Sequence, residues 1–202
     1  STWYASAGTS NRVPTPVELA CSDPEFPCLL PNAMAADPFL EQVITTTVEG
    51  GYRTRWASGA NQFGFSFNVF RADNKNDILF VTDGAGSGGF FQNYGKTRRQ
   101  GLELDFDWDV SAWNFGASYQ YLDATFQSAA RLASEGNSSA VDGNGNPAVE
   151  GGFIQVQPGN KIPGLAEHNL KLSLGYKASV ATTLFVDMQA QSEQYARGNE
   201  NN

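Results

Sequence analysis

The chain has 202 residues, and its 13 Lys and Arg against 21 Asp and Glu give a formal net charge of −8. This length suits one large domain or two small ones. The acidic balance argues against nucleic-acid binding, because neutralising phosphates needs a basic stripe and the densest basic run is only Lys96, Arg98 and Arg99. A transmembrane helix is excluded as well, since the longest notable apolar run covers residues 78–81 and a helical span needs about 20 residues.

The predicted elements are all strands. Their main signal is strict alternation of apolar and polar residues, which places every other side chain on the same face of a strand. Several are longer than the usual strand of about five or six residues in a soluble protein. In chain order, the predicted strands cover residues 2–10, 41–57, 62–81, 89–110, 112–127, 166–178 and 181–196.

The alternation is clearest in residues 101–110 and recurs at 63–69, 113–121, 169–176 and 183–191. Phe185 is an apolar exception on the polar face of the last strand. In residues 101–110 one face carries Leu102, Leu104, Phe106, Trp108 and Val110, and the other carries Glu103, Asp105, Asp107 and Asp109.

The connections between these strands alternate in length. Long or medium ones cover residues 11–40, 82–88 and 128–165, and short ones cover 58–61, 111–112 and 179–180. All tight turns therefore fall at one end of the sheet, as in outer-membrane barrels with short periplasmic turns and long extracellular loops. The aromatic residues that lie near short turns suit an interfacial girdle, and they are Trp56, Phe63, Trp108, Trp113 and Tyr176.

We therefore expect an all-β fold, an antiparallel transmembrane β-barrel segment with about seven long strands. The alternative is a soluble extracellular β-sandwich that binds carbohydrate, in which the apolar face packs on a second sheet. Strand length and loop parity favour the barrel. The polar faces agree, because they carry Asn, Gln, Ser, Gly and Asp where a solvent-facing sheet would be rich in Lys and Glu.

The acidic row from Glu103 to Asp109 also permits a third hypothesis, a carboxylate-based glycosidase. Alternate residues on a strand lie about 6.6 Å apart, which is close to the carboxylate spacing of inverting enzymes. A solvated lumen wall explains the same row without catalysis. A Ser/His/Asp or Cys/His set is not available either, because the chain has one His, His168, and two Cys. We expect no catalytic residues, no metal site and no cofactor.

Cys21 and Cys28 lie seven residues apart in a Pro-rich stretch, far in sequence from His168. Metal sites usually need a second such pair or a His partner. We therefore expect a loop disulfide between Cys21 and Cys28, which implies an oxidising compartment outside the cytosol.

Several segments together resemble the latter part of the barrel of TonB-dependent receptors of the Gram-negative outer membrane. Arg98-Arg99-Gln100-Gly101-Leu102-Glu103 is the most specific of them. The segments follow the family's order and spacing over nearly the whole chain, at residues 11–21, 27–32, 36–40, 70–79, 93–103, 162–170 and 194–202.

The resemblance implies energy-coupled uptake of a scarce ligand, such as a siderophore-iron complex or a cobalamin-like or carbohydrate nutrient. Its implied partners are outer-membrane lipid, the TonB energy-coupling protein acting through a plug domain, and the small-molecule ligand. Relative to the family pattern, the plug and the final strands are absent, so residues 1–202 are expected to be part of a barrel that family members close with about 22 strands. Ligand contacts would come from the long loops at residues 11–40, 82–88 and 128–165, with no single residue favoured.

Overall fold

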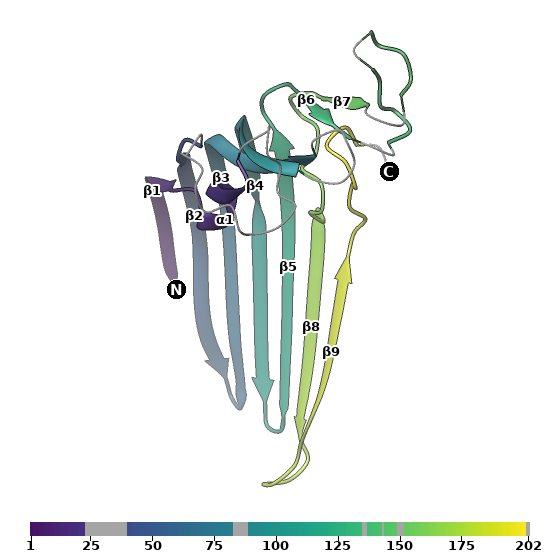
Figure 1. Ribbon diagram of the computed structural model, residues 1–202. Coiled ribbons are helices and arrows are strands. Elements are labelled where there is room, and N and C mark those ends of the chain that lie inside the picture. The colour runs from purple at the N-terminus through teal and green to yellow at the C-terminus, as the bar shows by residue number, and fades with distance from the viewer. Residues whose placement is uncertain (23–39, 83–88, 135–136, 143, 149–151, 201–202) are drawn as a thin grey trace.

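A computed structural model describes residues 1–22, 40–82, 89–134, 137–142, 144–148 and 152–200. Its main body is a seven-stranded antiparallel sheet with the order β1-β2-β3-β4-β5-β8-β9 (Figure 1). These strands are β1 Thr2–Arg12, β2 Val43–Ser58, β3 Asn61–Thr82, β4 Gly89–Val110, β5 Trp113–Phe126, β8 His168–Lys177 and β9 Thr183–Gln191. The seven strands predicted from alternation are confirmed, with boundaries that differ by a few residues.

Antiparallel pairing carries the alternation of each strand across the whole sheet. Phe63 is opposite Trp108 and Val69 is opposite Leu102, so apolar residues of β3 and β4 share one face. Ser66 is opposite Asp105 on the other face. We call the face with Trp108 and Leu102 the outward face, and the face with Asp105 the inward face.

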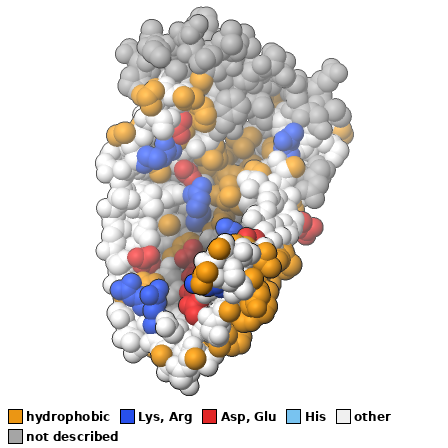
Figure 2. Space-filling view, turned by 90° about the horizontal axis from the view of Figure 1, so that it is seen from below, with side chains coloured by type: hydrophobic (Ala, Val, Ile, Leu, Met, Phe, Trp, Pro, Cys, Tyr) orange, Lys and Arg blue, Asp and Glu red, His pale blue; other side chains and the backbone are white. Residues whose placement is uncertain are grey.

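The two faces differ in chemistry as the lipid side and the lumen side of a barrel wall do. Acidic and basic side chains gather in the hollow of the curved sheet, and hydrophobic side chains form a patch along its outer side (Figure 2). The outward side chains are partly exposed, with Trp108 at 38%, Leu174 at 40% and Val69 at 43%. Within the described residues no second sheet covers them, which is what a sandwich would require.

The parity of the connections is also confirmed. The tight turns β2–β3, β4–β5 and β8–β9 gather at one end of the sheet, and the long connections lie at the other end (Figure 1). Gly59 and Ser111 adopt positive φ angles of 61° and 53° in the first two turns, which lets the chain reverse within two residues.

Two long connections contain regular structure that alternation did not predict. The short helix α1, Pro16–Ala20, starts with a capping box formed by Thr15 and Glu18. In the connection after β5, β6 Ala130–Ala133 and β7 Phe153–Val156 form a separate two-stranded sheet. These strands have four residues each, too few for alternation to stand out.

The larger of the two buried apolar clusters in the described residues lies at the end with the long connections. Phe126 of β5 and Val156 of β7 are 2% and 0% exposed, and Tyr94 packs on Phe126 with ring centroids 4.7 Å apart. This cluster attaches the connection after β5 to the barrel wall. Its buried members are Tyr94, Ala124, Phe126, Ala140, Ile154, Val156 and Ile162.

No helix in the part of the chain that the structure describes combines the length and apolar composition needed to cross a membrane.

Candidate functional site

The inward face is built as rows of polar side chains that run across three strands. Asp105 of β4 accepts a hydrogen bond from Ser66 of β3 at 2.9 Å and another from Ser118 of β5 at 2.8 Å. Glu103 is held in the same way by Asn68 and Gln120. The register places each donor directly opposite its acid. Each row therefore ties three neighbouring strands together while its carboxylate faces the hollow.

This arrangement suits a hydrated wall better than a hydrolytic site. The donors to Asp105 are two hydroxyls and the donors to Glu103 are two side-chain amides, so each carboxylate has neutral partners on both neighbouring strands. Paired catalytic carboxyls instead need environments that separate their protonation states. Within the described residues, no group of three or more His, Cys, Asp or Glu is placed to hold a metal ion.

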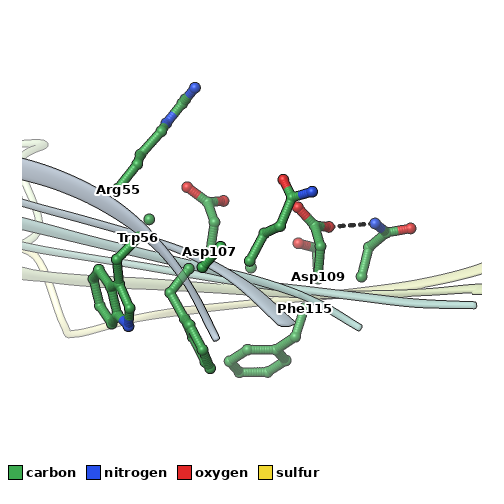
Figure 3. Close-up of a pocket in the computed structure, with 12 residues that line it drawn as sticks. Arg55, Trp56, Asp107, Asp109 and Phe115 are labelled. Atoms are coloured by element: carbon green, nitrogen blue, oxygen red, sulfur yellow. Dashed lines mark hydrogen bonds between the residues drawn. The ribbon is translucent and has the colours of Figure 1, made fainter. Parts of the chain in front are cut away.

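Near the tight turns the strands separate charged from aromatic side chains. Arg55, Asp107 and Asp109 rise from the inward side of the sheet, whereas Trp56 and Phe115 point to the outward side (Figure 3). Asp109 accepts a hydrogen bond from Asn114 across the β4–β5 turn. Gly64 lies opposite Asp107 and leaves space for its carboxylate, because a Cβ there would lie 3.3 Å from Asp107 Oδ2.

The outward aromatics form rows beside the tight turns. Phe63 stacks between Trp56 and Trp108, with centroid distances of 5.1 and 6.2 Å. Trp113 packs on Tyr176 at 4.3 Å. All five predicted girdle residues therefore share one face and one level of the sheet, where amphipathic rings suit a membrane interface.

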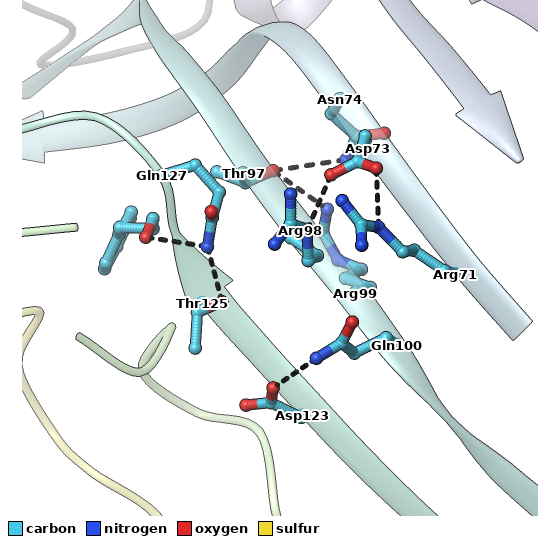
Figure 4. Close-up of polar contacts among 11 residues, drawn as sticks. Arg71, Asp73, Asn74, Thr97, Arg98, Arg99, Gln100, Asp123, Thr125 and Gln127 are labelled. Carbon is cyan, nitrogen blue, oxygen red and sulfur yellow. Dashed lines mark hydrogen bonds and ion pairs between the residues drawn. The ribbon is translucent and has the colours of Figure 1, made fainter. Parts of the chain in front are cut away.

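Farther from the tight turns, the polar network extends to both faces (Figure 4). On the inward face, buried Thr97 donates to Asp77 at 2.5 Å and accepts from Asn74 at 3.2 Å. Arg99 reaches the same Asp77 carboxylate at 3.3 Å. Sequence reasoning missed this cluster, because Asn74 and Asp77 on β3 lie 20 or more residues from their partners Thr97 and Arg99 on β4, and only the register joins them.

Lys161 ties the long connection after β5 to the wall. Its ammonium contacts Asp123 of β5 at 2.7 Å and also contacts Glu167. Burial alone lowers the pKa of Lys161, but hydrogen bonds to the two carboxylates outweigh burial and raise it above its usual range. Residues 128–165 were expected to form a loop. The salt bridges of Lys161 and the buried apolar cluster together hold this connection against the sheet.

The described first part of the connection between β1 and β2 contains α1, which side-chain contacts hold in place. Glu18 Oε2 lies 2.7 Å from Arg12 Nη1 in a salt bridge, and it accepts a hydrogen bond from the backbone N–H of Thr15 at 2.7 Å. Burial raises the pKa of Glu18, but the hydrogen bonds from Arg12 and Thr15 more than offset this and lower it. The backbone N–H of Phe91 then donates to the carbonyl of Cys21 at 2.6 Å, which joins the end of α1 to β4.

The predicted disulfide and ligand loops are only partly within the described residues. Cys21 is buried at 7% exposure, whereas Cys28 lies outside them, so the Cys21–Cys28 pairing stays a prediction. Much of loops 11–40 and 82–88 also lies outside the described residues.

His168 contacts aromatic rings, with its Nδ1 2.8 Å from the Tyr119 hydroxyl and its ring centroid 5.3 Å from that of Tyr121.

An apolar outward face, a hydrated inward face, aromatics at the tight turns and large structured connections at the other end define the wall of an outer-membrane β-barrel. The family model described as TonB dependent receptor-like, beta-barrel matches residues 1–202, which is the whole chain. The chain belongs to the TonB-dependent receptor β-barrel family. This family consists of outer-membrane receptors and transporters, which act with TonB and small-molecule ligands.

Proposed function

We propose that this chain is the wall segment of a Gram-negative outer-membrane receptor that takes up a scarce ligand by energy coupling. The ligand class is a siderophore-iron complex or a cobalamin-like or carbohydrate nutrient. The observation that carries the proposal is the two-sided wall, apolar outside and hydrogen-bonded by polar side chains inside. A wall of this kind encloses a path for a hydrophilic solute.

We further propose that residues 1–202 act within a longer receptor that supplies a plug and more strands. The outer edges of β1 and β9 have no neighbouring strand within the described residues. Open edges in a membrane leave backbone N–H and C=O groups without partners, at a cost of several kcal/mol each. Closing the barrel would satisfy them. DNA sequence on both sides of the coding segment tests this, because it should encode a plug domain upstream and further alternating strands downstream.

The loops at residues 11–40, 82–88 and 128–165 are proposed to contact the ligand. Support comes from α1, β6 and β7, which give the described parts of two of these loops regular structure. A rigid scaffold that presents structured loops is typical of ligand sites.

Uptake by whole cells tests the function. Cells with and without the complete receptor are given labelled ferric siderophores, cobalamin and maltodextrins. We expect one ligand class to depend on the receptor and on the TonB protein, and that dependence should disappear when the membrane potential is collapsed. Equal uptake of every ligand without the receptor would refute the proposal, as would a receptor that is monodisperse in buffer without detergent.

A further inference from the structure

A compact group of basic residues lies on the outward face, next to the apolar surface. Its six residues include four cations and one acid, so their net charge is +3 in a chain whose net charge is −8. We call it the basic block, and it consists of Arg71, Asp73 and Lys75 on β3 with Lys96, Arg98 and Gln100 on β4. The next acid on this face, Asp123, lies opposite Gln100 and accepts its hydrogen bond, and it is paired with Lys161.

The register places the basic block on the outward face. Arg71 is opposite Gln100, Asp73 opposite Arg98, and Lys75 opposite Lys96. These pairs continue, two residues at a time, from the outward pair of Val69 and Leu102. The basic block therefore starts one step beyond the apolar surface, toward the end of the sheet with the long connections.

Asp73 holds two guanidinium groups side by side. Its Oδ1 accepts from Arg98 Nε at 2.7 Å, and its Oδ2 accepts from Arg71 Nε at 2.8 Å (Figure 4). Each arginine uses Nε for this contact. Among the described residues, neither arginine has another salt bridge. The terminal amino groups, Nη1 and Nη2, of both guanidinium groups are therefore available to bind an anion. The Arg71 and Arg98 side chains are 51% and 27% exposed.

The charges of the two lysines of the basic block are not balanced by a carboxylate of the described residues, as Asp73 balances those of the arginines. Lys75 and Lys96 are exposed and directly opposite each other on neighbouring strands. Like charges in this arrangement are destabilising. No carboxylate pairs with either lysine in the part of the chain that the structure describes. An anion bound beside the two lysines would offset this repulsion.

We propose that the basic block binds the phosphate groups of a membrane lipid. The guanidinium groups of Arg71 and Arg98 fit phosphate through their remaining forked donors, and Lys75 and Lys96 act as point charges. A lipid is the occupant because the apolar outward face continues directly from the basic block, and phosphate joined to acyl chains matches both surfaces. The proposal rests on the outer-membrane placement of the family.

Native mass spectrometry of the complete receptor in detergent micelles tests this with lipid A that carries two phosphates. The double variant Lys75→Gln/Lys96→Gln keeps the Asp73 contacts and removes the repulsion, so it should fold as well as the unchanged receptor. We expect its affinity for this lipid to fall on the order of tenfold, with a weaker dependence on salt. Arg71→Gln/Arg98→Gln should cause at least as large a loss.

The matched control is Arg53→Gln/Lys177→Gln, which removes two cations from the inward face of the same sheet. We expect this control to bind the lipid as the unchanged receptor does. Dephosphorylated lipid A should bind each form equally weakly. The proposal is overturned if the outward variants retain full affinity, if the control loses as much, or if millimolar inorganic phosphate displaces the lipid and shows that free phosphate is the ligand.

Discussion

A substitution at Gly101 tests whether β4 and β5 approach each other as closely as the structure shows. A Cβ added at Gly101 would lie 2.0 Å from the backbone oxygen of Tyr121, below the 3.0 Å that real Cβ atoms respect. The Gly101→Ala variant must therefore move β4 away from β5 by about 1 Å, since the obstacle is backbone and has no rotamer to change. Such a shift stretches the neighbouring hydrogen bonds of the ladder beyond their normal range.

The expected cost follows from these two effects. Overpacking costs about 1–3 kcal/mol, and each weakened ladder hydrogen bond adds about 1 kcal/mol. We expect Gly101→Ala to lower the free energy of unfolding by about 2–4 kcal/mol. Gly8→Ala is the matched control, because Gly8 also lies in a strand but a Cβ there meets nothing within 4 Å. Its effect should stay within about 0.5 kcal/mol.

The assay is urea unfolding of the complete receptor in detergent, followed by the mobility shift of folded barrel on unheated gels. The two alanine variants are compared with the unchanged protein under identical conditions. If Gly101→Ala unfolds at the same urea concentration as Gly8→Ala, the close approach of β4 and β5 at this position is wrong.

Three further predictions concern the long connections. Lys161→Met should make the connection after β5 sensitive to limited proteolysis, because Asp123 and Glu167 would face each other without a cation, at a cost of about 1–3 kcal/mol. The control is Lys177→Met, which changes an exposed lysine that has no salt bridge in the described part of the chain. This control should not increase proteolysis of the connection. The pKa of Glu18 is lowered, so its stabilisation of α1 is present above the ordinary Glu pKa and lost as pH falls through the lowered value. Hydrogen exchange of the backbone amides of residues 17–20, corrected for intrinsic rate, should rise at acidic pH in the unchanged protein and stay level in Glu18→Gln. Mass spectrometry of the non-reduced receptor should show Cys21 joined to Cys28, and free thiols at both positions would contradict the disulfide.

The strand pattern was predictable because it depends on local chemistry. A side chain's face is set by its position in a period of two, so Leu102 to Val110 and Glu103 to Asp109 separate in any extended strand. The connection lengths set which ends of the strands meet, which is why the parity of turns and loops could also be predicted.

The candidate site was predictable only in part. The sequence predicted that the acidic residues of β4 share one face, but their hydrogen-bond donors come from β3 and β5 and depend on strand pairing. The outward basic block had a local signal, since apolar residues give way to Arg71, Asp73 and Lys75 after Val69. What the pattern did not reveal is that Asp73 holds Arg98, which lies 25 residues away.

The sequence by itself determined the seven strands, their two faces and the end at which the tight turns gather, because each follows from residue spacing along one strand or one connection. Tertiary structure decided the contacts that depend on register and on chain folding across long separations. Asp73 meets two arginines, Lys161 meets Asp123, and Phe126 packs with Val156 only when β3, β4, β5 and the connection after β5 are aligned in space.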